Sequence, residues 1–257
     1  MTDITIGSHV YRIDLNQPHA LGIELHAQGP RAWYVDPMRI APVLMPYVTG
    51  SVKLGGNVNF NEVHFNPHGH GTHTETVGHI AAEDFPISAL KVPFFMPTLL
   101  VTIEPQMVDT KKGWNEIGDQ CITLAQLQDA LLSHRPEALV IRTLPNGPTK
   151  CSQNYSGTNF CYFEPEGLAW LAAQGVAHLL VDLPSVDREE DGGLLLAHRA
   201  FWQYPHATRA QSTITELIYA PDHVADGWYL LHLSWAQFRN DAAPSQPVLF
   251  AAALLAE

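Results

Sequence analysis

Three apolar runs separated by two helical patterns constrain the fold of this sequence most strongly. The runs PTLLVTIE (residues 97–104), ALVIRTL (138–144) and HLLVDL (178–183) are typical of strands that are buried on both faces. Such strands belong to parallel sheets, in which crossover helices join one strand to the next. The order strand, helix, strand, helix, strand therefore predicts an α/β protein.

Both segments between these runs carry signals for the ends of a helix. Thr123 and Gln126 have the spacing of a capping box, which predicts a helix that runs to about Ser133. Pro165 is favourable in the first turn of a second helix, and Gly175 is favourable just after its end. The crossovers between the strands are therefore predicted to be helical.

The first part of the chain is richer in strand-like segments, among them YRIDL and NVNFNEVHF, and shows no convincing helix before residue 80. The 19 prolines and 18 glycines are spread along the chain rather than gathered into a linker. We therefore predict one domain over residues 1–257, with a central mixed β-sheet or barrel-like sheet flanked by helices.

Charge and hydropathy exclude several classes of partner. The formal net charge is −12 and no segment concentrates Lys or Arg, whereas nucleic-acid binding requires a basic surface. The opening MTDITIGSHVYRIDL lacks the pattern of a signal peptide. An apolar run of 9 residues at 248–256 is about half of what a membrane-spanning helix needs. We predict a cytoplasmic protein without nucleic-acid or membrane partners.

Histidine is unusually abundant and clustered. The chain has 14 histidines, as many as its Lys and Arg residues together, and five of them lie in the segment HFNPHGHGTHTETVGH (64–79). Histidine ligates metals and transfers protons near neutral pH. Pro67, Gly69 and Gly71 disfavour a regular helix here, so we expect the histidines to lie on a loop.

Within this segment, His73 and Glu75 are two residues apart, which places both side chains on the same side of an extended chain. Imidazole nitrogen and carboxylate oxygen together suit zinc or manganese. The spacing differs from the helical HExxH site, in which two histidines are one turn apart. The alternative to a metal site is a polar loop whose histidines face solvent.

The same segment resembles the signature H-x-G-T-H-x-D-x-P-x-H of the cyclase family of metal-dependent hydrolases, which includes bacterial kynurenine formamidases and isatin hydrolase. The residues 71–73 (Gly-Thr-His), Glu75 and His79 stand in this register. YRIDL near the start, LVIRT around Arg142 and VDLPSVD at 181–187 are similar to other blocks of the family.

The resemblance implies a role for each matching residue. His73 and Glu75 correspond to metal ligands and His79 to the catalytic proton shuttle. His198, in LLAHRAFW, and Glu216, in TITELIYAP, correspond to two further ligands late in the chain.

Three departures from the signature indicate a divergent subgroup. Gly69 stands at the position of the first histidine, so that ligand is either His68 or His70. We expect His68, because Gly69 can absorb an extra residue as a bulge. Glu75 replaces an Asp, and Val77 replaces the Pro of the signature.

The resemblance implies one or two divalent ions per chain, with zinc expected and manganese as the alternative. A metal-bound hydroxide would then attack a small amide, formamide or lactam, with His79 moving the proton. We expect a hydrolase of C–N bonds other than peptide bonds, similar to an arylformamidase, that forms a homodimer or larger homo-oligomer. The alternative is a metal- or ligand-binding protein of the same fold with little or no turnover.

The substrate pocket is less defined by the sequence. Arg142, at the end of a predicted strand, is either a binding group or an ion-pair partner of Asp182. Aromatic residues in two segments are candidates for an apolar pocket wall: Trp33, Tyr34, Phe94 and Phe95.

Overall fold

The central sheet of this protein closes on itself to form a barrel. The computed structural model describes residues 1–256, in which seven strands pair in the order β16-β15-β8-β11-β13-β14-β7, and β7 pairs again with β16. The predicted barrel-like sheet is therefore confirmed. The barrel strands are β7 (His73–Glu75), β8 (Met96–Ile103), β11 (Ala138–Thr143), β13 (His178–Val181), β14 (Thr213–Glu216), β15 (Gly227–Trp235) and β16 (Ala242–Ala256).

Strand directions in the barrel are mixed, as predicted. β8, β11, β13 and β14 are parallel, whereas β7 and β15 run antiparallel to both of their neighbours. The three apolar runs recognised in the sequence became the adjacent strands β8, β11 and β13. β1 (Thr2–Ile6) and β2 (His9–Ala20) extend the sheet beyond β16 as an antiparallel pair.

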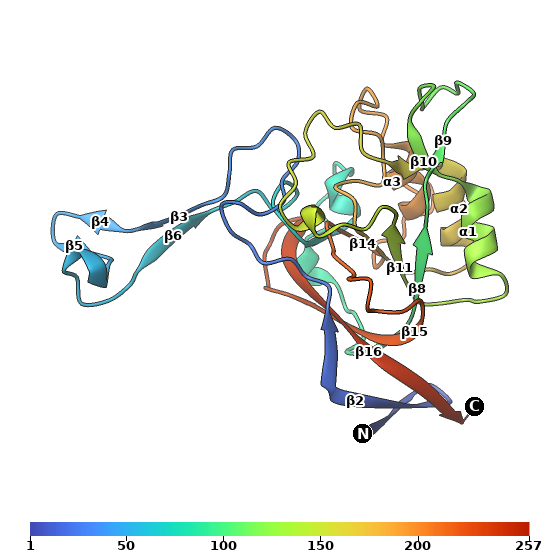
Figure 1. Cartoon of the computed structure of the whole chain (residues 1–257), viewed down its shortest axis with the longest axis horizontal. Coiled ribbons are helices and arrows are strands. Elements are labelled where there is room, and N and C mark those ends of the chain that lie inside the picture. Colours follow the sequence, from blue (N-terminus) through green and yellow to red (C-terminus); the bar gives the residue numbers. More distant parts are fainter. Residues whose placement is uncertain (257) are drawn as a thin grey trace.

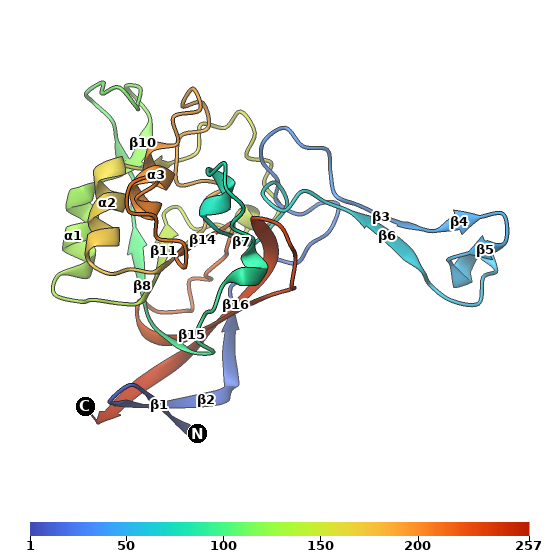
Figure 2. The ribbon, with the colours of Figure 1, turned by 180° about the vertical axis from the view of Figure 1, so that it is seen from behind.

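Three helices cover one outer side of the barrel (Figures 1 and 2): α1 (Leu124–Leu131), α2 (Pro165–Ala173) and α3 (Leu196–Trp202). The predicted capping box of Thr123 and Gln126 is present at the start of α1. Pro165 begins α2, and Gly175 follows its end with φ +89°. Within residues 1–256, no helix has the length and apolar character needed to cross a membrane.

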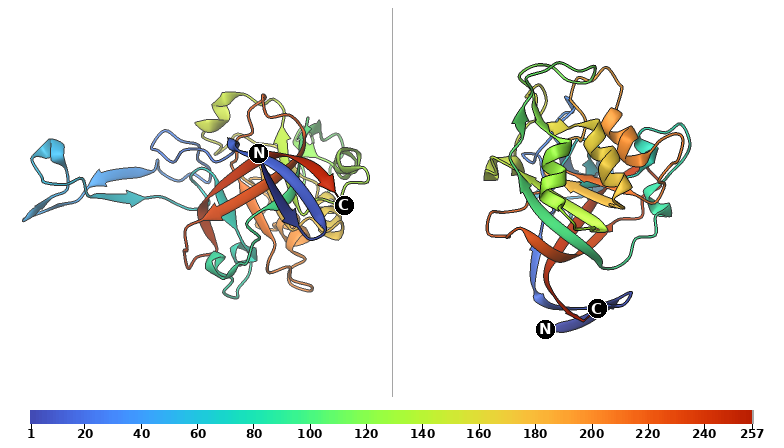
Figure 3. Two further views of the ribbon diagram at one scale, coloured as in Figure 1. Left: turned by 90° about the horizontal axis from the view of Figure 1, so that it is seen from below. Right: turned by 90° about the vertical axis from the view of Figure 1, so that its right-hand side faces the viewer.

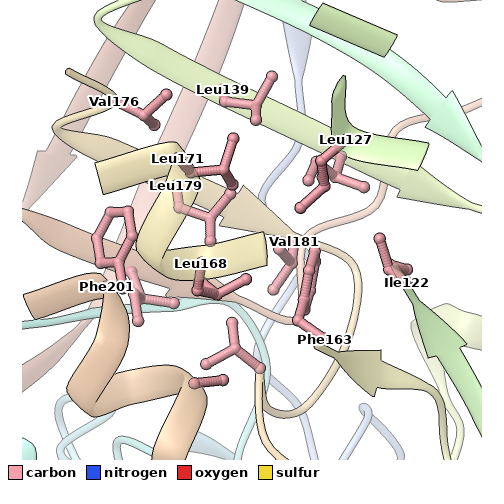
Figure 4. Packing of buried hydrophobic residues seen from close by; sticks show 14 of the residues in the cluster. Ile122, Leu127, Leu139, Phe163, Leu168, Leu171, Val176, Leu179, Val181 and Phe201 are labelled. Carbon is pink, nitrogen blue, oxygen red and sulfur yellow. The ribbon is translucent and has the colours of Figure 1, made fainter. Parts of the chain in front are cut away.

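Two apolar clusters lie on opposite faces of the barrel wall. Between the wall and the helices, Leu168 and Leu171 of α2 and Phe201 of α3 pack against Leu139 and Val181 (Figure 4). On the inner face, alternate residues of β8, β11 and β13 (Leu100, Val140 and Leu180) pack with Leu231 of β15 and Leu249 of β16. This two-sided burial explains why these strands are apolar without alternation.

A long β-ribbon projects away from the barrel (Figures 1 and 3). We call residues 39–64 the arm. β3 (Arg39–Pro42) and β6 (Asn61–His64) pair along its stem, and its distal part carries β4 (Leu44–Met45), β5 (Val48–Thr49) and a 3-10 turn (Val52–Leu54). Ten large apolar side chains of the arm are 40% exposed or more: Ile40, Leu44, Met45, Tyr47, Val48, Val52, Leu54, Val58, Phe60 and Val63.

The remaining elements are short. β9 (Gln106–Met107), β10 (Gln120–Ile122) and β12 (Tyr162–Phe163) form a small separate sheet. Further 3-10 turns lie at Val77–His79, Ile87–Ala89 and Pro148–Cys151. The first of these turns follows β7 directly, and it places His79 beside the strand that carries His73 and Glu75.

Candidate metal centre

Strands β7 and β14 place three site residues side by side. Glu216, the last residue of β14, is paired with His73 of β7, and His73 Nε2 lies 3.4 Å from Glu216 Oε2. Glu75 lies two residues further along β7 and is fully buried. The expectation that the whole histidine segment is a loop was wrong for His73 and Glu75, because pairing with β14 and β16 makes these residues a strand.

Helix α3 adds His198 to these residues. His198 Nε2 lies 3.1 Å from Glu75 Oε1 and 3.7 Å from Glu216 Oε1. The other ring nitrogen, Nδ1, donates a 2.6 Å hydrogen bond to Asp187. Asp187 also accepts from the backbone N–H groups of Ala197 and His198, at 2.7 and 3.1 Å, and so caps the start of α3. The Asp187 carboxylate thus holds the first turn of α3 and the orientation of the His198 ring.

His68 and His79 complete the cluster on the other side of Glu75. His68 Nδ1 lies 3.0 Å from Glu75 Oε2, and its Nε2 donates a 2.7 Å hydrogen bond to Asp241. His79 Nδ1 lies 3.8 Å from Glu75 Oε2 and 3.7 Å from Asp241 Oδ2. The rings of His68 and His79 are 4.2 Å apart, centre to centre. Glu75 therefore lies within 4 Å of His68, His79 and His198, whereas the carboxylate within 4 Å of His73 is that of Glu216.

The cluster contains donor atoms that the protein leaves without partners. Among residues 1–256, His68 Nδ1, His73 Nε2 and Glu75 Oε2 are buried and make no hydrogen bond. Burying a polar atom without a partner costs roughly 1–3 kcal/mol. Nitrogen and carboxylate oxygen together are the donor set of zinc and manganese sites. The unpartnered atoms therefore fit a divalent cation.

The donors fall into two overlapping groups, each compact enough for one ion. His73, Glu75 and Glu216 form one group, and His68, Glu75 and His79 form the other. Within each group the donor atoms lie within 4.8 Å of one another. Glu75 belongs to both groups, so it stands where a carboxylate can bridge two ions.

Charges in the cluster also favour a cation. Burial and the nearby charge of Glu75 raise the pKa of Glu216. Burial alone lowers the pKa of His68, but the contacts with Asp241 and Glu75 outweigh it and raise this pKa to about 10. A cation would relieve the repulsion between the two glutamates, and its binding at His68 would release a proton.

A comparison with protein families identifies the family of this chain. Residues 13–188 match the family model described as "Putative cyclase". The chain belongs to the cyclase family. The match includes His68, His73, Glu75 and His79, whereas His198 and Glu216 follow it in the sequence.

Solved structures share the cyclase-family fold over most of the chain. A predicted metal-dependent hydrolase from Bacillus stearothermophilus is 15% identical, with a TM-score of 0.61 over 91% of this chain and 98% of that one. An isatin hydrolase bound to the product analogue thioisatinate is 11% identical, with a TM-score of 0.65 over 91% and 92%. Isatin hydrolase A from Labrenzia aggregata, bound to benzyl benzoate, is 12% identical, with a TM-score of 0.58 over 91% and 93%. Because these sequence identities are low, the similarity shows a shared fold only.

The structure separates the two candidates for the first histidine of the cyclase-family signature. His70 Nδ1 accepts from the backbone N–H of Asn66, and His70 Nε2 donates to the carbonyl of Asp36, both at 2.8 Å. Neither ring nitrogen of His70 is left for an ion, whereas His68 lies in the cluster. Gly69 forms no strand bulge; it lies in a turn where a Cβ atom would be 2.9 Å from a methyl group of Val35.

Two carboxylates of the site were missed at the sequence level. Asp187 lies in the VDLPSVD block that carries the family resemblance, but its partner His198 is not deducible from that block. Asp241 has no local signal at all, because it lies far along the chain from His68 and His79. Only the closure of the barrel brings Asp241 to them.

Arg142 forms an ion pair, which was one of its two predicted alternatives, but the suggested partner Asp182 was wrong. Its guanidinium binds Asp226 at 2.8 Å and donates to the carbonyls of Pro221 and Val224, which holds the segment before β15. Asp182 instead accepts from Lys150 at 2.7 Å.

The aromatic candidates divide between two regions. Phe94 and Phe95 lie just before β8, at the opposite end of the parallel strands from Glu216, and they pack with His232. These two residues therefore do not line the metal site. Trp33 packs edge-to-face on Phe160 at 5.9 Å, in a segment whose Ala32 N–H donates to Gly69 beside His68. Tyr34 is exposed in the same segment.

Proposed function

We propose that this cyclase-family protein is a metal-dependent hydrolase that cleaves a small amide, formamide or lactam. The observation that carries the proposal is the buried Glu75 carboxylate, which belongs to both donor groups. Its Oε2, His68 Nδ1 in one group and His73 Nε2 in the other are buried and have no hydrogen-bond partner among residues 1–256. The names of the structural neighbours, a metal-dependent hydrolase and isatin hydrolases, support the same class of activity. Cleavage of a non-peptide C–N bond, as in an arylformamidase, is the finer part of this proposal.

Five residues would hold the metal, with zinc expected and manganese as the alternative. One or two divalent ions would act as Lewis acids, lowering the pKa of a water molecule and polarising a substrate carbonyl. The ligands proposed are His68, His73, Glu75, His198 and Glu216. Within this set, Gly71 accepts from His73 Nδ1 at 3.0 Å and Asp187 accepts from His198 Nδ1, so both rings turn Nε2 toward the glutamates.

His79 is proposed as the proton shuttle. Its Nδ1 points to the cluster, 3.8 Å from Glu75 Oε2, while its side chain is 30% exposed. At this position Nδ1 can take a proton from the attacking water and return it to the departing nitrogen. The carboxylate of Asp241, 3.7 Å away, would stabilise the positively charged ring.

Two substitutions test the proposal. Metal content and hydrolysis of a panel of aryl formamides and lactams are measured for the wild type, Glu75→Gln and His79→Ala. We expect Glu75→Gln to lose both metal and turnover, and His79→Ala to keep the metal and lose turnover. The matched control is His64→Ala, which removes an exposed histidine of the same segment.

Other results would change the proposal in defined ways. A wild type that takes up no metal on reconstitution would refute the metal site. Metal uptake without hydrolysis of any substrate in the panel would favour the alternative, a binding protein of the same fold. Loss of one ion from His79→Ala would show that His79 is a ligand, because its Nδ1 also belongs to one of the donor groups.

The arm supports the further proposal of a homodimer or larger homo-oligomer. Its ten exposed apolar side chains would be costly to leave in water, and exposed apolar side chains gathered in one segment indicate an interaction site. The arm carries only three charged residues, Arg39, Lys53 and Glu62, in a chain with net charge −12. A nearly neutral arm can therefore approach another acidic copy without strong repulsion.

Oligomeric state is tested by light scattering on the wild type and on Tyr47→Asp and Phe60→Asp. These two side chains are 98% and 53% exposed, so the substitutions leave the barrel unchanged. We expect a dimer or larger wild type and a shift toward monomer in both variants. A monomeric wild type at micromolar concentration, or variants that assemble as the wild type does, would refute this role of the arm. A cytoplasmic location is part of the proposal and is tested by cell fractionation.

A further inference from the structure

We infer that Asp241 is a positioning residue of the metal site, and that it fixes which nitrogen of His68 faces the metal. The inference rests on the proposed function, since it concerns a residue that supports one of the proposed ligands. It also explains how a histidine that is one residue out of register with the family signature can still serve as a ligand.

The backbone holds Asp241 firmly against the segment that carries the histidines. Its carbonyl accepts a 2.9 Å hydrogen bond from Thr76 N–H, directly after Glu75. The next residue, Ala242, begins β16 and is paired with Glu75. Gly78 permits this approach, because a Cβ atom at Gly78 would lie 3.0 Å from the Cβ of Asp241. The position of Asp241 is thus set by closure of the barrel.

The side chain of Asp241 determines the orientation of the His68 ring. Its Oδ2 accepts from His68 Nε2 at 2.7 Å, which leaves Nδ1 directed at Glu75 Oε2, 3.0 Å away. Nδ1 is one of the buried atoms that make no hydrogen bond with the described residues 1–256. A carboxylate that binds the outer nitrogen of a ligating histidine fixes its tautomer and makes the inner nitrogen a better donor.

His68 is inverted relative to the two other proposed histidine ligands. His73 and His198 are held at Nδ1, by Gly71 and Asp187, and turn Nε2 toward the cluster. His68 is held at Nε2 and turns Nδ1 inward. Nδ1 is closer to the backbone than Nε2, so its use shortens the reach of the side chain. Use of Nδ1 in place of Nε2 is therefore the change expected when the histidine ligand comes from position 68 and not from position 69 of the signature.

The same carboxylate also faces the proposed proton shuttle. Asp241 Oδ2 is 3.7 Å from His79 Nδ1, and the rings of His68 and His79 are 4.2 Å apart. Loss of Asp241 should therefore weaken metal binding through His68 and, separately, slow turnover through His79.

The test compares Asp241→Asn, Asp241→Ala and the control Asp84→Asn in the full-length protein. Asp84 is an exposed carboxylate that pairs with Arg239 at 3.0 Å, so the control removes the same charge close to Asp241 without touching a histidine of the cluster. Zinc affinity is measured by competition with a chromophoric chelator. We expect a 10- to 100-fold loss in Asp241→Ala, a smaller loss in Asp241→Asn and no change in Asp84→Asn. Urea unfolding of the metal-free proteins separates this effect from a general loss of stability.

A second readout identifies the nitrogen itself. In the zinc-loaded wild type, long-range ¹H–¹⁵N correlation spectra should show the His68 proton on Nε2 and the metal on Nδ1. A His68 bound through Nε2, or zinc affinity in Asp241→Ala within twofold of the wild type, would overturn the inference while leaving the proposed function standing. Failure of the wild type itself to bind zinc or manganese would overturn both.

Discussion

Asp187→Asn separates the two tasks that this carboxylate performs. The substitution keeps the size of the side chain and removes its charge. Asp187 accepts three hydrogen bonds, from His198 Nδ1 at 2.6 Å and from the backbone N–H groups of Ala197 and His198. An asparagine has one oxygen, so its amide NH₂ must face at least one of these groups. If it faces the ring, His198 Nδ1 becomes the acceptor and the ring proton moves to Nε2.

The expected magnitudes follow from these contacts. A hydrogen bond to a charged group contributes about 1.5–3 kcal/mol, and replacement of a capping side chain costs about 1 kcal/mol. We therefore expect the free energy of unfolding of the metal-free protein to fall by about 2–3 kcal/mol. A proton on His198 Nε2, which lies 3.1 Å from Glu75 Oε1, would block a proposed ligand atom. Metal affinity should fall about 10- to 100-fold.

Urea unfolding of the metal-free protein and zinc competition measure the two effects separately. Asp191→Asn is the matched control, because Asp191 accepts from the backbone N–H groups of Gly193 and Leu195 in the same loop but does not touch His198. Zinc affinity equal to that of the wild type in Asp187→Asn, together with reduced stability, would show that Asp187 is a helix cap only. The argument from the His198 tautomer would then be refuted.

Three further predictions concern stability. Burial and the charge of Arg209 lower the pKa of His178 to about 4, so between about pH 6.5 and pH 4 the unfolded chain binds the additional proton. The free energy of unfolding of the wild type should therefore fall by up to about 3 kcal/mol as the pH drops through this range, and it should fall less in His178→Gln. If urea unfolding gives the same dependence of this free energy on pH in both proteins, the prediction is contradicted. Leu168→Ala, in the core beneath α2, should lower the free energy of unfolding by about 2–5 kcal/mol in the same assay. A loss below about 1 kcal/mol would show that neighbouring side chains move in to fill the cavity. In thermal unfolding, zinc at 100 times its Kd should stabilise the wild type by about 2.7 kcal/mol, and addition of a chelator should remove this stabilisation. Zinc should leave the stability of Glu75→Gln unchanged.

Local signals in the sequence were sufficient for the parallel half of the barrel. β8, β11 and β13 lie within two residues of the predicted strands, because burial on both faces leaves a continuous apolar run. The start of α1 was predicted because the capping box is formed by residues three apart. These features depend on neighbours in the chain, so they can be recognised without the fold.

Features that depend on distant pairing were not predicted. β7 is three residues long and reads His-Thr-Glu, so it lacks the composition of a strand; its hydrogen bonds to β14 and β16 make it one. The arm carries many apolar residues that face solvent, so its sequence gives no sign that it leaves the core. The contact of Asp241 with His68 depends on the same closure of the barrel.

Closure of the barrel by β16 determines when the site can be built during synthesis. β7 emerges from the ribosome before either strand that pairs with it, and β16 comes last among the strands of residues 1–256. Until β16 arrives, Glu75 lacks the pairing through Ala242 that holds it in the wall, and His68 lacks Asp241. A nascent chain would therefore present the histidines singly, as weak ligands. Metal binding and completion of the barrel would then occur together, late in synthesis. The incompletely synthesised chain would not bind metal ions in a non-native geometry.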